Sequence, residues 1–183
     1  MRSHRNLRFV ATACVLYLAQ GVMEVEKETQ EALTKSKRKS SSYETLIKES
    51  HDLLEQLYIQ VVSHRVRDVA PQTRLLTVVM ISELTHCYPK YQTDDYLKYV
   101  GTALGDSEST IRLEAVRQLV QLYCFARTVR IRLREDDAND VVRDVLRRYK
   151  ARILFMSRDS APVVIMAVVT LIDEMKGLCF PLL

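Results

Sequence analysis

The stretch Arg67-Asp-Val-Ala-Pro-Gln-Thr-Arg74, with the apolar run that follows it, decides the fold of this chain. The same pattern returns at Gly105-Asp-Ser-Glu-Ser-Thr-Ile-Arg112 and, in a weaker form, at Arg158-Asp-Ser-Ala-Pro-Val-Val-Ile165. In each copy an Asp, with Ser or Pro nearby, precedes an apolar stripe. These residues signal a helix start, because an Asp side chain can cap free backbone N–H groups and Pro tolerates the first turn. The stretch therefore predicts three helices that begin alike.

The apolar residues that follow the three aspartates fall into register. When Asp68, Asp106 and Asp159 are superposed, the positions 7, 10, 13 and 16 residues further on are apolar in every copy. Columns three residues apart trace a slanted stripe on a helix, and neighbouring residues widen it to an ordinary apolar face. The columns are Leu75, Leu113 and Met166; Val78, Val116 and Val169; Ile81, Leu119 and Ile172; and Leu84, Leu122 and Met175.

The spacing of the copies predicts a helical repeat array. The aspartates are 38 and then 53 residues apart, and a period of about 40 with two helices per unit is typical of HEAT and armadillo arrays. In HEAT repeats an Asp at the turn and an Arg on the second helix recur and bond between adjacent units. Asp68 with Arg74 and Asp106 with Arg112 resemble that pair, whereas the third copy carries Ile165 instead of the Arg. An ordinary bundle of amphipathic helices is the alternative.

The composition favours an all-α fold and sets few limits on function. Hydrophobic residues make up 48% of the 183 residues, with only four Gly and four Pro, and no segment alternates like a strand. The formal net charge of +4 does not by itself indicate nucleic-acid binding. The four cysteines are scattered without metal-site spacing, which is typical of reduced, buried thiols: Cys14, Cys87, Cys124 and Cys179.

The first residues allow two interpretations. Residues 1–8 are basic and residues 9–18 are mostly apolar, as in a secretory leader. The run then continues into a charged helical stretch without a small-x-small cleavage site, so a first helix sandwiched in a solenoid is the favoured interpretation. No run of about 18 charge-free apolar residues is present, so we expect no membrane-spanning helix.

We expect helices over residues 4–34, 43–63, 71–88, 94–101, 108–126, 139–155 and 160–176. The basic, Ser-rich residues 35–42 read as a solvated loop or a nuclear-import signal. This organisation divides the chain into N-terminal helices with that linker (1–60), a central pair of repeats (61–126) and further HEAT-like helices (127–183). No polar capping repeat closes the array, so we expect part of a longer solenoid.

No catalytic, cofactor-binding or metal-binding motif is recognisable in the sequence, so a non-enzymatic binding protein is the expectation. Two groups of residues are candidates for partner contact. One is the ridge of Asp94, Lys98 and Tyr99. The other is a basic helix with an interleaved aromatic residue, which suits a peptide carboxylate or a DNA backbone, although plain solvated surface is an equal alternative. Its residues are Arg143, Arg147, Arg148, Tyr149, Lys150 and Arg152.

Several motifs resemble the conservative domain of the stromalin (stromal-antigen) family, the HEAT-repeat subunit of cohesin. They are His64-Arg-Val-Arg-Asp68, Arg74, Tyr88-Pro89, Asp94-Asp-Tyr-Leu-Lys-Tyr-Val-Gly101, Asp106, Ile111-Arg-Leu113 and residues 119–123, with a weaker likeness through residues 148–153. The resemblance implies a nuclear, chromosomal scaffold that acts in sister-chromatid cohesion. It also implies binding to kleisin and SMC subunits, to regulators such as shugoshin-type proteins, and to double-stranded DNA, with most of the kleisin interface beyond Leu183.

The resemblance assigns the regulator-binding surface to Asp94, Lys98, Tyr99, Arg148 and Tyr149, and leaves Arg143, Arg147, Lys150 and Arg152 as DNA-binding candidates. Two aromatic residues of the family's pattern are replaced, Trp by Thr102 and Tyr by Val66. Each loss should weaken capture of an aromatic ligand by about 2 kcal/mol. The rival functions are a HEAT scaffold of another system, such as nuclear transport or a vesicle coat, and a secreted helical protein.

Overall fold

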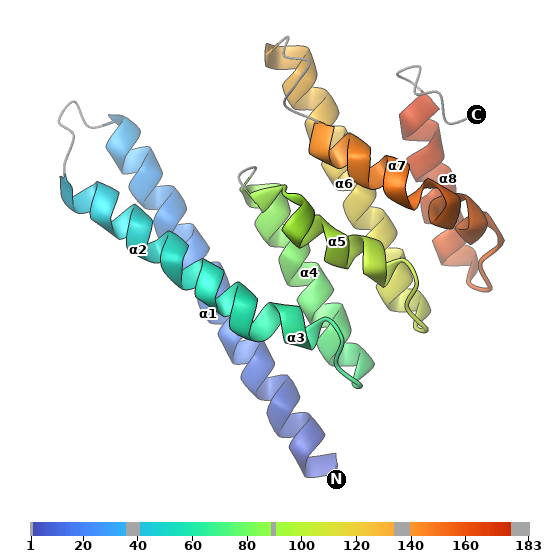
Figure 1. Ribbon diagram of the computed structural model, residues 1–183, viewed down its shortest axis with the longest axis horizontal. Helices are drawn as coiled ribbons and strands as arrows, with labels where there is room; N and C mark the ends of the chain where they lie inside the picture. The colour runs from blue at the N-terminus through green and yellow to red at the C-terminus, as the bar shows by residue number, and fades with distance from the viewer. Residues whose placement is uncertain (1, 36–40, 89–90, 134–139, 177–183) are drawn as a thin grey trace. The chain divides into compact units, whose positions relative to one another are not determined.

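The computed structural model describes residues 2–35, 41–88, 91–133 and 140–176, and every regular element in these ranges is helical (Figure 1). The helices are α1 (Arg2–Lys35), α2 (Ser41–Leu57), α3 (Ser63–Arg65), α4 (Pro71–Cys87), α5 (Asp94–Ala103), α6 (Ser109–Leu133), α7 (Asp140–Phe155) and α8 (Pro162–Lys176), with a π turn at Tyr58–Val62 and a 3₁₀ turn at Met156–Arg158. The all-α prediction is confirmed. Most of the Ser-rich stretch 35–42 lies outside the described residues.

The chain forms two compact units, residues Met1–Thr77 and Val78–Leu183, which are described separately. In the first unit α1 and α2 pack against each other (Figure 1). The packed face of α1 is a seam in which buried positions alternate at spacings of four and three, as in a coiled coil. Its residues are Thr12, Leu16, Ala19, Met23 and Glu26.

The π turn keeps one face of the second helix buried. Leu54, Tyr58, Val62 and Val66 are all buried at intervals of four residues, and in an α-helix of 3.6 residues per turn such a row would drift around the helix. The wider π turn removes this drift where the N–H of Ser63 donates to the carbonyl oxygen of Tyr58, five residues earlier.

The three repeat turns have one geometry. Asp68, Asp106 and Asp159 each accept, through Oδ1, a hydrogen bond of 2.9 Å from the backbone N–H two residues on. That second residue directly precedes the helix, and its carbonyl oxygen accepts the first α-helical bond. Each Asp therefore stabilises an Asx turn before the helix.

The buried face of α8 differs from the predicted columns. Val78 and Val116 are buried as expected, whereas Met166 and Val169 are exposed. The core residues of α8 are Val164, Val168, Leu171 and Met175. Among the described residues α6 packs against α5, α7 and α8, while α8 packs chiefly on α6 and the 3₁₀ turn. The outer side of its apolar stripe therefore remains uncovered there.

The first helix is long and apolar enough over His4–Lys35 to cross a membrane, by length and composition only. The expectation that no helix spans a membrane stays a prediction. Core helices and secretory leaders satisfy the same criterion, and the buried seam of α1 shows one face packed inside the unit. This packing agrees with the interpretation of α1 as a first solenoid helix.

Candidate partner-binding surface

The five residues assigned by resemblance to regulator binding gather on α5 and α7, in one surface that we call the α5/α7 surface. α5 begins directly after Thr93, whose backbone is extended, and its first turn carries Asp94 and Asp95. Acidic residues at this position are stabilised by the positive end of the helix dipole. Lys98 follows Asp94 by one turn, so both side chains lie on the same side of α5.

An ion pair joins the two helices. Nη1 of Arg148 on α7 donates to Oδ1 of Asp94 on α5 at 2.6 Å, and both side chains remain about half exposed. An exposed pair of this kind contributes little to stability. Its main effect is to orient the guanidinium group at the surface, where an anionic partner group could compete with Asp94.

Lys98 interacts with both its neighbours on α5. Its Nζ donates to Oδ1 of Asp95 at 3.0 Å and lies 5.3 Å from the centroid of the Tyr99 ring. The hydrogen bond to Asp95 raises the pKa of Lys98 above its ordinary value, so the side chain is cationic at neutral pH. The cation is therefore held beside an aromatic ring.

The ring of Tyr149 packs directly on Gly101. A Cβ at Gly101 would collide with this ring, so the close approach of α7 to α5 depends on the glycine. The Tyr149 hydroxyl donates to the carbonyl oxygen of Lys98 at 3.5 Å, and the Thr102 hydroxyl donates to the same oxygen at 2.8 Å. Gly101 and Thr102 thus shape the surface without being among the residues predicted to form it.

The DNA-binding candidates on α7 differ in their contacts within the protein. Arg147 donates to Asp144 at 2.6 Å, and Arg152 donates to the carbonyl oxygen of Leu104 at 3.2 Å and lies against the Phe155 ring. Arg143 and Lys150 are half-buried on the same helix. Because the first two contacts lie on the protein's own surface, DNA would have to share or displace them.

Arginine–aspartate pairs hold successive helices together, as the HEAT pattern implies. In the second unit Arg112 on α6 binds both carboxylate oxygens of Asp159, at 2.7 Å each, and donates to the carbonyl oxygens of Asp106 and Ser107. The Arg therefore binds the backbone of its own turn and the carboxylate of the next. The hydrogen bond with Arg112 lowers the pKa of Asp159 and raises that of Arg112.

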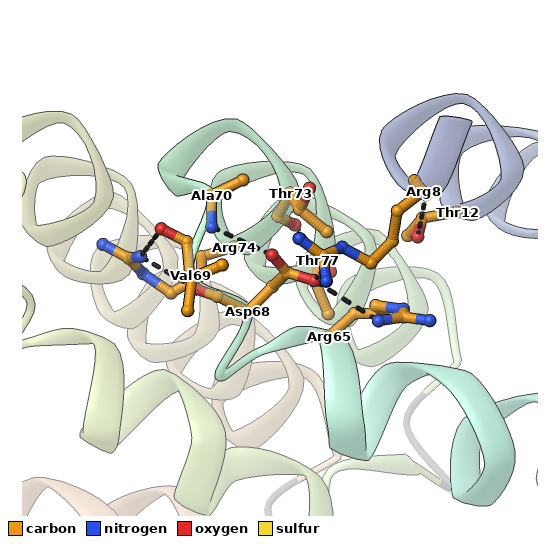
Figure 2. Close-up of polar contacts among 9 residues, drawn as sticks. All are labelled: Arg8, Thr12, Arg65, Asp68, Val69, Ala70, Thr73, Arg74 and Thr77. Carbon is orange, nitrogen blue, oxygen red and sulfur yellow. Dashed lines mark hydrogen bonds and ion pairs between the residues drawn. The ribbon is translucent and has the colours of Figure 1, made fainter. Parts of the chain in front are cut away.

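The first unit contains a similar cluster around Asp68 (Figure 2). Arg8 on α1 lies 3.1 Å from the Asp68 carboxylate and Arg65 lies 3.3 Å from it, while Arg74 donates to the carbonyl oxygen of Asp68 at 2.9 Å. Sequence reasoning missed Arg8, because the pattern of repeat turns does not extend to α1. The only available signal was a basic residue at the start of an otherwise apolar helix.

Residues 67–134 match the stromalin conservative domain. The match shows the resemblance to the stromalin family over this part of the chain. Two repeat turns and the α5 part of the α5/α7 surface lie within this match, and Arg148 and Tyr149 lie beyond it. The resemblance stated from the residues is confirmed.

Cohesin subunits are among the proteins to which this chain is similar. It is 26% identical to Cohesin subunit scc-3 of Caenorhabditis elegans, over 65% of this chain and 13% of that protein. It is 36% identical to human Cohesin subunit SA-3, over 41% of this chain and 6% of that protein. The solved structure of Cohesin subunit Scc3 from Z. rouxii superposes on 96% of this chain and 21% of that chain, with a TM-score of 0.68 and 25% identity. The predicted HEAT-type solenoid class is thereby confirmed, and the chain spans less than a quarter of the length of these relatives.

Proposed function

We propose that this chain acts as a non-catalytic scaffold subunit of cohesin, in the nucleus and on chromosomes, in sister-chromatid cohesion and chromosome organisation. The observation that carries the proposal is the stromalin conservative domain at residues 67–134, together with relatives that are cohesin subunits. Its action would be to hold partners in a fixed geometry on stacked helices. The partners would be kleisin and SMC subunits and cohesin regulators, with no membrane, cofactor or metal involved.

Affinity purification of the chain tagged at its own locus, followed by mass spectrometry, tests this function. We expect the two SMC ATPases and a kleisin to be recovered with it. An untagged strain and a strain with a tagged unrelated helical-repeat protein are the controls. Recovery of nuclear-transport or vesicle-coat proteins instead would assign the chain to a different HEAT scaffold.

We propose further that the α5/α7 surface binds a peptide of a cohesin regulator. The support is physical: Lys98 lies over the Tyr99 ring on α5. Arg148 on α7 pairs with Asp94, which lies one helix turn before Lys98 on α5. Such a site suits a segment that carries an aromatic residue and an acidic group. Thr102 occupies a position where a larger aromatic wall would enclose that ligand, so we expect weak affinity.

Titration of an aromatic-motif peptide from a shugoshin-type protein, followed by fluorescence anisotropy, tests this surface. We expect Tyr99→Ala to weaken binding by about 10-fold or more, as a hot-spot residue would. Tyr43→Ala is the matched control, because Tyr43 is an exposed tyrosine on α2. If Thr102→Trp strengthens binding while Tyr99→Ala abolishes it, the location is supported; equal binding by all variants would contradict it.

DNA contact by α7 is a second, separate proposal. Arg143, Arg147, Lys150 and Arg152 supply its positive charge, and phosphate contacts make affinity strongly salt-dependent. For each lost phosphate contact the slope of log affinity against log salt should fall by about 1. We expect this for Arg147→Gln with duplex DNA and not for Arg117→Gln, an exposed arginine on α6. A flat salt response of the unaltered protein would exclude the proposal.

A further inference from the structure

The first helix carries a second apolar seam on the side away from its packed face. Leu7, Val10, Tyr17 and Leu18 are between 56% and 68% exposed, and Cys14 and Gly21 are exposed between and beyond them. Positions 7, 10, 14, 17 and 21 alternate at spacings of three and four, the pattern of a coiled-coil seam. They are two residues out of step with the buried seam, which is roughly 200° around the helix.

We propose that this outer seam pairs with the same seam of a second copy of the chain, with the two α1 helices antiparallel. A face so rich in exposed apolar residues marks an interaction site. Its heptad spacing is that of helices that pack on another helix, so we expect a helix to bind there. Two properties of the seam, its distribution of side-chain sizes and its distribution of charge, select the antiparallel second copy.

The side-chain sizes complement each other only in the antiparallel arrangement. With the two-fold axis between Val15 and Leu16, Tyr17 of one copy faces Cys14 of the other, and Val10 faces Gly21. At Gly21 an added Cβ would meet no atom within 4 Å, so there is room for a facing side chain. Large residues thus oppose small ones at these two pairs, as close packing of facing positions requires, while Leu7 lies opposite Glu24 at the end of the seam. A parallel pair would instead place Tyr17 against Tyr17 and Gly21 against Gly21.

The charges along α1 favour the same arrangement. The first part of the helix is basic, with Arg5 exposed, and the last part exposes Glu24, Glu28 and Glu31. Antiparallel pairing brings the basic end of each copy toward the acidic end of the other, whereas parallel pairing aligns like charges. An isologous dimer of this kind has the two-fold symmetry that is commonest among homo-oligomers.

Sedimentation equilibrium of the 183-residue chain over a range of micromolar concentrations tests the pairing. We expect a monomer–dimer equilibrium that Tyr17→Glu weakens by at least about 10-fold, with an unchanged circular dichroism spectrum because the Tyr17 side chain is exposed. Met166→Glu on α8, where Met166 is 66% exposed, is the matched control and should dimerise like the unaltered chain. A monomer at every concentration would overturn the proposal.

Disulfide formation tests the direction of the pair. In a background with Cys87, Cys124 and Cys179 replaced by Ser, one variant keeps Cys14 and the other combines Cys14→Ser with Tyr17→Cys. Mild oxidation should link the two variants when they are mixed and should link neither alone. Rapid cross-linking of the first variant alone would indicate a parallel pair and contradict the proposal. Binding of the monomer to anionic liposomes, lost in Tyr17→Glu, would assign the seam to lipid and likewise overturn it.

Discussion

Arg112 and Asp159 form a bidentate ion pair between consecutive repeats, with Nε and Nη2 of the guanidinium each 2.7 Å from one carboxylate oxygen. The two side chains retain only 10% and 8% of their exposure. The same guanidinium donates through Nη1 to two carbonyl oxygens of its own turn. One arginine therefore ties the start of α6 to the turn before α8, and its removal would leave a carboxylate and two carbonyls to find other partners.

Removing Arg112 should destabilise the second unit strongly. Breaking a buried ion pair by removing one partner costs about 3–5 kcal/mol, because it leaves an uncompensated buried charge. We expect a loss in that range for Arg112→Ala in urea unfolding followed by circular dichroism. Asp173→Asn is the control. Asp173 and its ion-pair partner Lys176 are both exposed, so the free energy of unfolding should fall by at most about 1 kcal/mol. Equal effects of the two variants would contradict the role given to Arg112.

The same pair should make stability depend on pH in the acid range. The pKa of Asp159 is lowered from its ordinary value of 3.8 by the hydrogen bond from Arg112. A group whose folded pKa lies below its unfolded pKa contributes stability that is complete above the unfolded pKa and is lost as the pH falls through the folded pKa. We therefore expect the free energy of unfolding to decline below about pH 4.

Asp159→Asn isolates this contribution. The amide cannot titrate, so the variant should be less stable than the unaltered chain at pH 7, and the difference between the two should shrink as the pH falls. Urea unfolding at a series of acid pH values measures this difference. A difference that stays constant down to the acid-unfolded state would mean that Asp159 has the same pKa in the folded and unfolded chain.

In the first unit, Arg8 and Arg65 share one buried carboxylate, that of Asp68. Either arginine alone leaves the carboxylate with a charged partner. Arg65→Ala removes a hydrogen bond to the carboxylate and should cost about 1.5–3 kcal/mol. Arg8→Ala removes an ion pair whose Nε makes no hydrogen bond, so it should cost less. The double change should cost more than the sum of the two, because it leaves Asp68 without either cation. Arg67→Ala is the control, since Arg67 is exposed in the same turn. Strict additivity in a double-mutant cycle would show that the two arginines act independently.

Much of the fold was predictable because its signals are local. The Asp of each turn, the Pro or Ser that follows and the apolar columns lie within about 20 residues of sequence, the range over which helix periodicity acts. The buried face of α8 was not predictable from these columns, since Met166 and Val169 are exposed while Val164 and Val168 are buried. That outcome depends on which neighbouring helix is present, which no local pattern records.

The contacts between helices could not be predicted either, because they join residues that lie far apart in the sequence. Asp94 and Arg148 are separated by 54 residues, and nothing in the spacing of either pairs it with the other; the family resemblance alone placed them on one surface. The pairing of Arg8 with Asp68 is also non-local, and no resemblance pointed to it. Gly101 was visible only as part of a motif, because its role depends on the ring of Tyr149 that packs on it.

At Gly101 a change to Ala should destabilise the protein, the opposite of its usual effect inside a helix. Replacing Gly by Ala inside a helix normally stabilises by about 0.5–1 kcal/mol. At Gly101 the new methyl group would meet the Tyr149 ring, so we expect Gly101→Ala to destabilise by about 1–3 kcal/mol, as overpacking does. Gly21→Ala is the matched control, because a Cβ there meets nothing within 4 Å and should stabilise. Adding Tyr149→Ala to Gly101→Ala should make the effect of the alanine favourable again relative to Tyr149→Ala alone. If Gly101→Ala raises the midpoint of thermal unfolding in the otherwise unaltered chain, then α7 does not pack on α5 through this ring.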